Sequence, residues 1–150
     1  MDIEDLLKLL KENVVDFVII GASAFPVHGY SRATLDIDIF IRPEQDNAER
    51  TLRALKEFGY DVTDITIEDL LTKKLLIRQY AVETDIHPFV TGTTFREVWK
   101  NKVQDFYGDV SAFFASLDDL IKMKESAKRP QDLEDLKYLR ELKKRQSNKK

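Results

Sequence analysis

Asp36 and Asp38 stand one strand repeat apart in the segment RATLDIDIFIR (residues 32–42), where aliphatic and polar positions alternate. This period of two, together with the β-branched residues, predicts a strand over residues 35–41. On such a strand the two carboxylates share one face, with Cα atoms roughly 6.7 Å apart, and the aliphatic side chains share the other. Since like charges repel at this spacing, the pair requires a cationic partner.

A third carboxylate, Asp85, lies in a second alternating run, VETDIHPFV (residues 82–90). If this run is a strand beside residues 35–41, then Asp36, Asp38 and Asp85 meet on one face of a sheet. Three hard oxygen ligands suit Mg²⁺ or Mn²⁺. Two such ions about 3.5–4 Å apart stabilise the attacking and leaving oxygens of a phosphoryl or nucleotidyl transfer. These residues therefore predict a metal site that acts on a triphosphate.

Gly21 follows a nearly continuous apolar run, VVDFVII (residues 14–20), and precedes residues 22–29, which we expect to form a short helix. The apolar run indicates a buried strand. A glycine between strand and helix lets a phosphate group approach the backbone N–H groups at the start of the helix. Ser23 adds a hydroxyl, so we expect the phosphates of a ligand near Gly21 and Ser23.

The run IIGASAFPVHGYSRATLDIDIFI, followed much later by VETDIHPF, resembles the nucleotidyltransferase superfamily. The pattern of that family is an apolar residue, Gly, Gly or Ser, a gap, Asp-apolar-Asp, and a third acid on a later strand. The chain is more closely similar to a small prokaryotic branch that includes the AbiEii-type toxins and the minimal nucleotidyltransferase antitoxins. The motifs of that branch match at Gly21, His28, Gly29, Arg32, Thr34, Asp36 and Asp38, and again at Lys124, Ala127, Arg129, Asp132 and Asp135.

The resemblance implies a reaction in which a hydroxyl attacks the α-phosphate of a nucleoside triphosphate and pyrophosphate leaves. It implies that Asp36 and Asp38 bind two metal ions, and that Asp85 binds one and accepts the proton of the attacking hydroxyl. The acceptor stays open among a partner protein, an RNA end and a small molecule. Basic side chains would hold the phosphate oxygens: Lys124, Arg129 and Arg32.

The chain departs from the family at Ala22, where the family has Gly or Ser. Alanine keeps the backbone N–H of this position, so Ala22 counts with Gly21 and Ser23 as a triphosphate-binding residue. It supplies no hydroxyl and disfavours a left-handed backbone. Ala22 therefore keeps open a function of another class, a non-catalytic binding module that acts through protein contact, for instance as one half of a toxin–antitoxin pair.

Other interpretations of these residues compete with the metal site. Considered alone, the acidic strand is equally typical of an exposed sheet face whose acids pair with Lys or Arg. Haloacid dehalogenases also use Asp-x-Asp, but their first Asp lies in the loop after a strand, whereas apolar residues continue here to Ile41. Metal-dependent glycosyltransferases share the motif but need a larger domain. Arg129, Asp132 and Asp135 are also compatible with ion pairs between two helices, and Lys124 with a solvated helix face.

The rest of the pattern predicts the elements that position these residues. Apolar spacings of three and four indicate helices, short β-branched runs indicate strands, and a capping pattern at Ser116 and a proline at 130 start the last two helices. The expected helices are residues 3–10, 43–58, 67–73, 94–100, 116–127 and a last one with Leu133, Leu136, Leu139 and Leu142 on one side. Further strands are expected at residues 60–65, in a hairpin over 75–90, and in a hairpin over 103–116. This order predicts an α/β (α+β) fold, a nucleotidyltransferase-like mixed β-sheet flanked by helices with a C-terminal helical pair.

Composition limits the possible partners. The 150 residues suit a single domain, residues 1–150, with a basic and frayed tail over residues 143–150. A formal net charge of −3 provides no overall basic field for nucleic acid. The chain has no cysteine and two histidines, which excludes thiolate metal sites and disfavours a zinc site based on imidazole. We find no signal peptide and no apolar run of membrane length, so we expect a cytoplasmic location and no membrane partner.

Overall fold

The computed structural model describes residues 1–31, 34 and 36–148. Six strands form one mixed sheet in the order β3-β4-β2-β1-β6-β5. The strands are β1 (Phe17–Ile20), β2 (Asp36–Ile41), β3 (Leu75–Ile77), β4 (Glu83–His87), β5 (Val103–Tyr107) and β6 (Val110–Phe114). Strand β2 runs antiparallel to β1 and parallel to β4, while β3/β4 and β5/β6 are antiparallel hairpins. The predicted hairpins and the predicted α+β class are confirmed.

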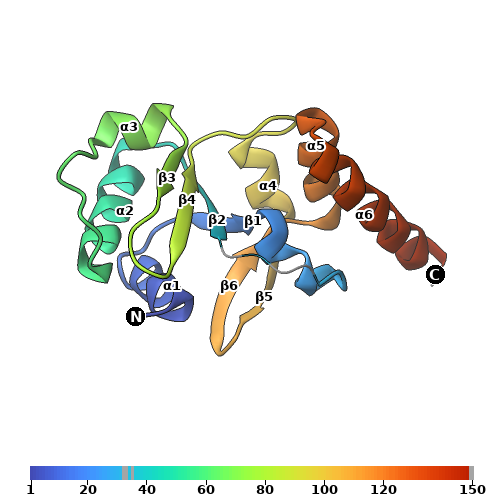
Figure 1. Cartoon of the computed structure of the whole chain (residues 1–150), viewed down its shortest axis with the longest axis horizontal. Coiled ribbons are helices and arrows are strands. Elements are labelled where there is room, and N and C mark those ends of the chain that lie inside the picture. Colours follow the sequence, from blue (N-terminus) through green and yellow to red (C-terminus); the bar gives the residue numbers. More distant parts are fainter. Residues whose placement is uncertain (32–33, 35, 149–150) are drawn as a thin grey trace.

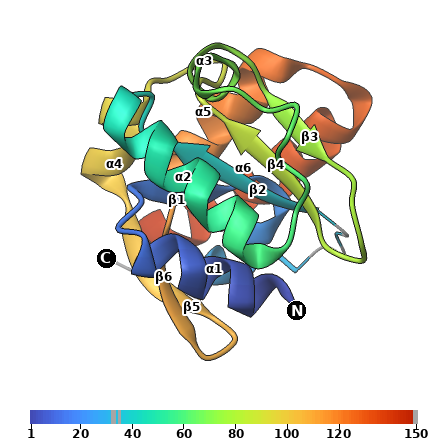
Figure 2. The same cartoon turned by 90° about the vertical axis from the view of Figure 1, so that its left-hand side faces the viewer.

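Helices flank the sheet on both sides (Figure 1). Helices α1 and α2 lie together in front of the sheet in Figure 2, and α5 and α6 lie behind it. Within the described ranges, no helix combines the length and the apolar character that a membrane span requires. The helices are α1 (Ile3–Glu12), α2 (Gln45–Phe58), α3 (Ile67–Thr72), α4 (Phe95–Asn101), α5 (Leu117–Ala127) and α6 (Pro130–Asn148), with two 3-10 helices, η1 (Gly21–Ala24) and η2 (Pro26–His28).

The alternation of β2 separates a core face from a polar face, as predicted. Ile37, Ile39 and Ile41 are fully buried, and each contributes about 1.5–3 kcal/mol to folding. Asp36 and Asp38 are only partly buried, because their side chains point to the opposite face. Burial of the aliphatic face therefore fixes the orientation of the strand and leaves both carboxylates on the other side.

A tight turn joins the two C-terminal helices. Ser116 caps α5 with its side chain, and the helix ends at Lys128, which has a left-handed backbone with φ +56. Pro130 then begins α6, where its missing N–H costs no hydrogen bond. The ring of Tyr30 stacks on Tyr138 with centroids 5.0 Å apart, which holds α6 against the segment after η2.

The last helix packs on the core over only part of its length. Leu133 is exposed, whereas Leu136 and Leu139 are buried, so only part of the predicted apolar stripe packs on the core. Helix α6 also continues to Asn148, so residues 143–148 of the basic tail extend it. Once the packed part of a helix has formed, each added residue gains a backbone hydrogen bond without a new nucleation step.

Two predicted elements near the acidic strand also differ from the structure. Residues 60–65 form no strand, because Tyr60 is buried and its hydroxyl donates to the Val82 carbonyl at 2.5 Å, which draws this segment across the start of β4. Residues 22–29 form two short 3-10 helices in place of one helix. The break falls at Pro26, whose nitrogen has no hydrogen to donate.

Candidate active site

Five polar side chains gather on the polar face of β2 and β4. The parallel register aligns Asp38 with Asp85 and Asp36 with Glu83, and His87 lies two residues further along β4. Aligned residues of neighbouring strands point to the same face, so four carboxylates and one imidazole share it. The predicted neighbourhood of the two acidic strands is confirmed, and Glu83 adds a fourth acid.

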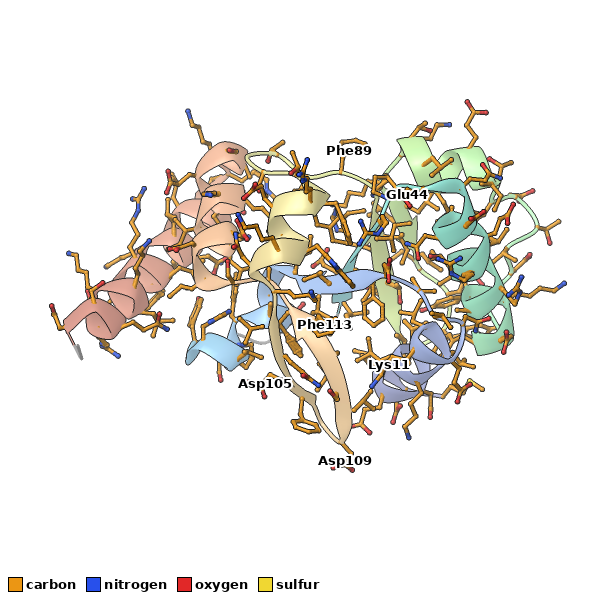
Figure 3. All side chains as sticks on the ribbon, turned by 180° about the vertical axis from the view of Figure 1, so that it is seen from behind. Lys11, Glu44, Phe89, Asp105, Asp109 and Phe113 are labelled. Atoms are coloured by element: carbon orange, nitrogen blue, oxygen red, sulfur yellow. The ribbon has the colours of Figure 1, made fainter. Side chains whose placement is uncertain are left out.

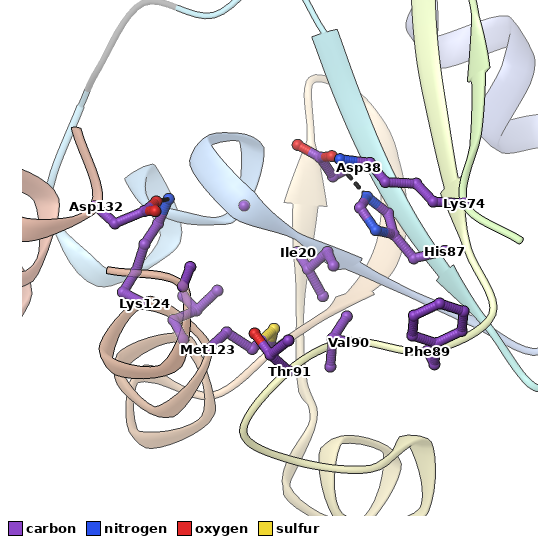
Figure 4. Close-up of a pocket in the computed structure, with 13 residues that line it drawn as sticks. Ile20, Asp38, Lys74, His87, Phe89, Val90, Thr91, Met123, Lys124 and Asp132 are labelled. Carbon is purple, nitrogen blue, oxygen red and sulfur yellow. Dashed lines mark hydrogen bonds and ion pairs between the residues drawn. The ribbon is translucent and has the colours of Figure 1, made fainter. Parts of the chain in front are cut away.

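Asp38 lies against the backbone of Gly21. Its Oδ1 accepts a hydrogen bond from Nε2 of His87 at 2.8 Å (Figure 4). Gly21 has φ +66, and a Cβ atom added there would lie 2.5 Å from Oδ2 of Asp38. Glycine is therefore required for two reasons, the left-handed backbone and the space that the carboxylate occupies. The turn after β1 and the imidazole together hold Asp38 in one place.

Arg78, the residue after β3, supplies the cation that the acidic strand requires. Its Nη1 donates to Oδ1 of Asp85 at 2.6 Å, its Nη2 lies 3.7 Å from Oδ2 of Asp36, and its Nε lies 3.7 Å from Oε2 of Glu83. The hydrogen bond to Asp85 raises the pKa of Arg78 above its ordinary value. A hydrogen bond with Asp36 raises the pKa of Glu83. The repulsion among these acids is thus offset in part by one guanidinium group.

Asp38, Asp85 and His87 have the chemistry of a cation site. One ligand atom from each lies within 4.8 Å of the others. Carboxylate oxygens suit Mg²⁺ and Mn²⁺, and an imidazole nitrogen is a ligand for many divalent ions. The donors therefore fit a divalent cation. Asp36 lies outside this group of three and faces Arg78.

A pocket of about 260 Å³ opens beside Asp38 and His87. Figure 4 shows Lys124 and Asp132 across the pocket from these two residues. Phe89 is largely exposed and lies on the connection after β4 (Figure 3). The pocket thus has Asp38 and His87 with Lys74 on one side and the Lys124–Asp132 pair on the other. The other lining residues are Ile20, Gly21, Val90, Thr91, Leu120, Met123 and Ala127.

Lys124 and Arg129 share a buried counterion, Asp132. Lys124 Nζ donates to Oδ1 of Asp132 at 2.8 Å and lies 3.4 Å from Asp135, while Nε of Arg129 donates to Oδ2 of Asp132 at 2.8 Å. Burial alone would raise the pKa of Asp132, but the hydrogen bonds from Arg129 and Lys124 outweigh it and hold that pKa well below 3.8. Asp132 chiefly, and Asp38 in smaller part, raise the pKa of Arg129. The turn between α5 and α6 therefore places Arg129 within electrostatic reach of Asp38, and Lys124 lines the same pocket as Asp38.

The other predicted residues lie around Gly21. The left-handed conformation falls on Gly21 itself, so Ala22 takes its place in η1 without that strain. The Ser23 hydroxyl donates to the backbone carbonyl of Asp36 at 3.1 Å, which ties η1 to the start of β2. Arg32 lies outside the described residues, and the structure says nothing of its predicted contact with phosphate.

The sequence analysis did not predict Arg78, Glu83 or His87 as residues of the site. Glu83 and His87 lie two positions before and two positions after Asp85 in the predicted strand, so the period of two alone places them on the same face as Asp85. Arg78 carries a weaker signal. Arg78 directly follows β3, and the predicted hairpin pairs β3 with β4, the strand of Asp85.

Comparison with known proteins gives one match at the level of the family. A family model described as nucleotidyltransferase of unknown function (DUF6036) matches residues 1–145. The matched range includes Gly21, all four acids of the polar face, and the turn between α5 and α6. No curated protein matches the chain.

Proposed function

Because the chain belongs to the family of nucleotidyltransferases of unknown function (DUF6036), we propose that it transfers a nucleoside monophosphate from a nucleoside triphosphate to a hydroxyl acceptor. The acceptor oxygen forms a bond to the α-phosphorus while the bond from the α-phosphorus to the bridging oxygen breaks, and pyrophosphate leaves. The proton of the hydroxyl passes to a carboxylate of the site. Residues 1–150 act as one nucleotidyltransferase-like domain in this proposal.

One observation carries the proposal furthest. Asp38, Asp85 and His87 converge within 4.8 Å, and Asp38 lines a pocket that Lys124 lines as well. Mg²⁺ or Mn²⁺ held by these carboxylates, together with Asp36 as the family resemblance implies, would offset the charge that develops on the α-phosphate. His87 orients Asp38 through its hydrogen bond, so the ligand does not need to be ordered when a cation binds.

The opposite wall is suited to a polyanion. Lys124 is only 14% exposed and its ammonium group is held by Asp132 at 2.8 Å, so its position is fixed before a ligand arrives. The Arg129 side chain is 72% exposed, which leaves its guanidinium accessible to phosphate oxygens. Asp85, beside the hydrogen-bonded Asp38, is the proposed proton acceptor. The proposed triphosphate-binding residues are Gly21, Ala22, Ser23, Arg32, Lys124 and Arg129.

A second candidate function is favoured by the internal pairing of charges. Arg78 already neutralises carboxylates of the polar face, and Asp132 already neutralises Lys124 and Arg129. These pairs offset the charges of both groups without metal or nucleotide. It would also suit a non-catalytic module that binds a partner protein, such as one half of a toxin–antitoxin pair of the kind to which the sequence motifs point.

Asp38→Asn separates the two functions. The amide keeps the shape of the side chain and still accepts from His87, but it removes a charged metal ligand. The wild type should show a rise in melting temperature with Mn²⁺ and at least one nucleoside triphosphate together, and Asp38→Asn should show none. Asp64→Asn, an exposed change away from the sheet, is the matched control. If the wild type shows no shift with any triphosphate, the enzymatic proposal loses its support.

The acceptor can be identified with the wild-type protein. Incubation with α-labelled triphosphates, Mn²⁺ and cell extract should transfer label to one class of molecule. Protease-sensitive label indicates a protein, RNase-sensitive label an RNA, and filterable label a small molecule. A binding module would transfer no label but should capture the same partner protein when Asp38 is replaced by Asn.

A further inference from the structure

Arg78 lies among the carboxylates of β2 and β4, but the proposed reaction assigns it no role. Its guanidinium contacts Asp85 at 2.6 Å and lies 3.7 Å from both Asp36 and Glu83. Two of these three acids, Asp36 and Asp85, are ones that the proposed function assigns to a divalent cation. A guanidinium and a divalent cation cannot both occupy the same carboxylate oxygens, so the two must compete.

Asp38 and Asp85 have different partners in the structure. Asp38 is bound by His87 and lines the pocket, whereas Asp85 is 6% exposed and bound by Arg78. A buried carboxylate without a cationic partner is unfavourable, so Asp85 requires Arg78 as long as no other cation is present. Arg78 therefore stabilises the polar face in the absence of metal.

The surroundings of Arg78 allow its guanidinium to move away from Asp85. It follows β3, which is three residues long and lies at the edge of the sheet. Its side chain is 40% exposed, so the guanidinium can turn into water by rotation of its own side-chain bonds. No change in the strands is needed for that rotation.

We propose that Arg78 is a positioning residue that keeps Asp36 and Asp85 together in the metal-free protein and is displaced from Asp85 when a divalent cation binds. This inference depends on the proposed function for its metal. Arg78 then acts as a competitor that weakens the binding of a cation alone. A cation that arrives with a triphosphate has the additional attraction of Lys124 and Arg129 for the phosphates.

The first test measures Mn²⁺ affinity without nucleotide, by the electron paramagnetic resonance signal of free Mn²⁺. Arg78→Gln should bind Mn²⁺ roughly tenfold or more tightly than the wild type, because the guanidinium that competes with the ion for Asp36 and Asp85 is removed. Arg53→Gln, on the exposed side of α2, removes the same charge far from the acids and should change the affinity less than about twofold. Equal or weaker binding by Arg78→Gln would overturn the inference and leave the proposed function standing.

The second test needs no variant. Phenylglyoxal modifies accessible guanidinium groups, and mass spectrometry of peptides follows the modification of each arginine. Mn²⁺ should accelerate the modification of Arg78 several-fold in the wild-type protein and leave that of Arg53 unchanged. Unchanged or slower modification of Arg78 at a Mn²⁺ concentration that saturates the protein would refute the displacement. If neither the wild type nor Arg78→Gln binds Mn²⁺, both the inference and the metal-dependent function are wrong.

Discussion

Gly21→Ala is the substitution that tests most directly how the turn after β1 positions Asp38. The added Cβ would lie 2.5 Å from Oδ2, 3.1 Å from Cγ and 3.3 Å from Cβ of Asp38. These atoms belong to a short side chain on a central strand, so it can give way only by rotating away from the glycine. That rotation breaks the 2.8 Å hydrogen bond from His87 and removes Asp38 from the group of possible ligands.

The magnitude follows from two contributions. An L-residue in the left-handed region costs about 1–2 kcal/mol, and this applies at φ +66. Loss of a hydrogen bond to a charged group costs roughly another 1.5–3 kcal/mol. We therefore expect Gly21→Ala to lower the free energy of unfolding by about 2.5–5 kcal/mol and to abolish measurable Mn²⁺ binding.

Gly59→Ala is the matched control. Gly59 has φ +105 and an added Cβ would meet nothing within 4 Å, so this variant carries at least the backbone strain of Gly21→Ala without any steric contact. Urea unfolding followed by circular dichroism gives both free energies, and the resonance signal of free Mn²⁺ gives both affinities. The reasoning is wrong if the two variants lose equal stability and both bind Mn²⁺ like the wild type.

Two further predictions concern the α5–α6 turn and the loop after α2. Asp132→Asn should destabilise the protein by about 3 kcal/mol at pH 7, because Lys124 and Arg129 lose a buried counterion. Since the folded-state pKa of Asp132 lies below its ordinary 3.8, its stabilisation is complete above that pH and is lost as the pH falls further. Urea unfolding of wild type and variant should therefore converge in acid, and a constant difference down to pH 3 would contradict this. Tyr60→Phe should cost about 1–2 kcal/mol, since the buried Val82 carbonyl loses its donor. An unchanged urea midpoint would show that water replaces the hydroxyl.

Local periodicity was sufficient to predict the faces of β2. Alternation is a property of the strand itself, so the burial of Ile37 and Ile39 and the common side of Asp36 and Asp38 follow without knowledge of any neighbour. Periodicity does not predict which strand lies beside β2, because its neighbour β4 is parallel to it and about forty residues away in the chain. Only the family motif indicated that Asp85 returns to the same face.

The position of Arg78 depends on details that periodicity does not contain. Its contact with Asp85 is set by the register of a three-residue strand and by the path of the turn through residues 79–82. A slip of one residue in that hairpin would turn the side chain of Arg78 to the other face. The exposure of Leu133 has a similar origin, since spacing along α6 predicts a stripe but not how much of it meets the core.

The pairing of charges on both walls of the pocket bears on how a ligand would bind. On the first side, Asp38 and His87 reach the pocket, and the neighbouring Asp85 has Arg78 as its cation. On the second side, Lys124 has Asp132 as its anion. In the proposed function, a metal ion alone would compete with Arg78 for the carboxylates, and a triphosphate alone would compete with Asp132 for Lys124 and Arg129. Each ligand would therefore gain only the difference between two similar interactions. A metal–triphosphate complex would present its cation to the acids of β2 and β4 and its anion to Lys124 and Arg129. Its two parts also attract each other. Binding of the complex should therefore be strongly cooperative, with metal and nucleotide each raising the affinity for the other by the same factor.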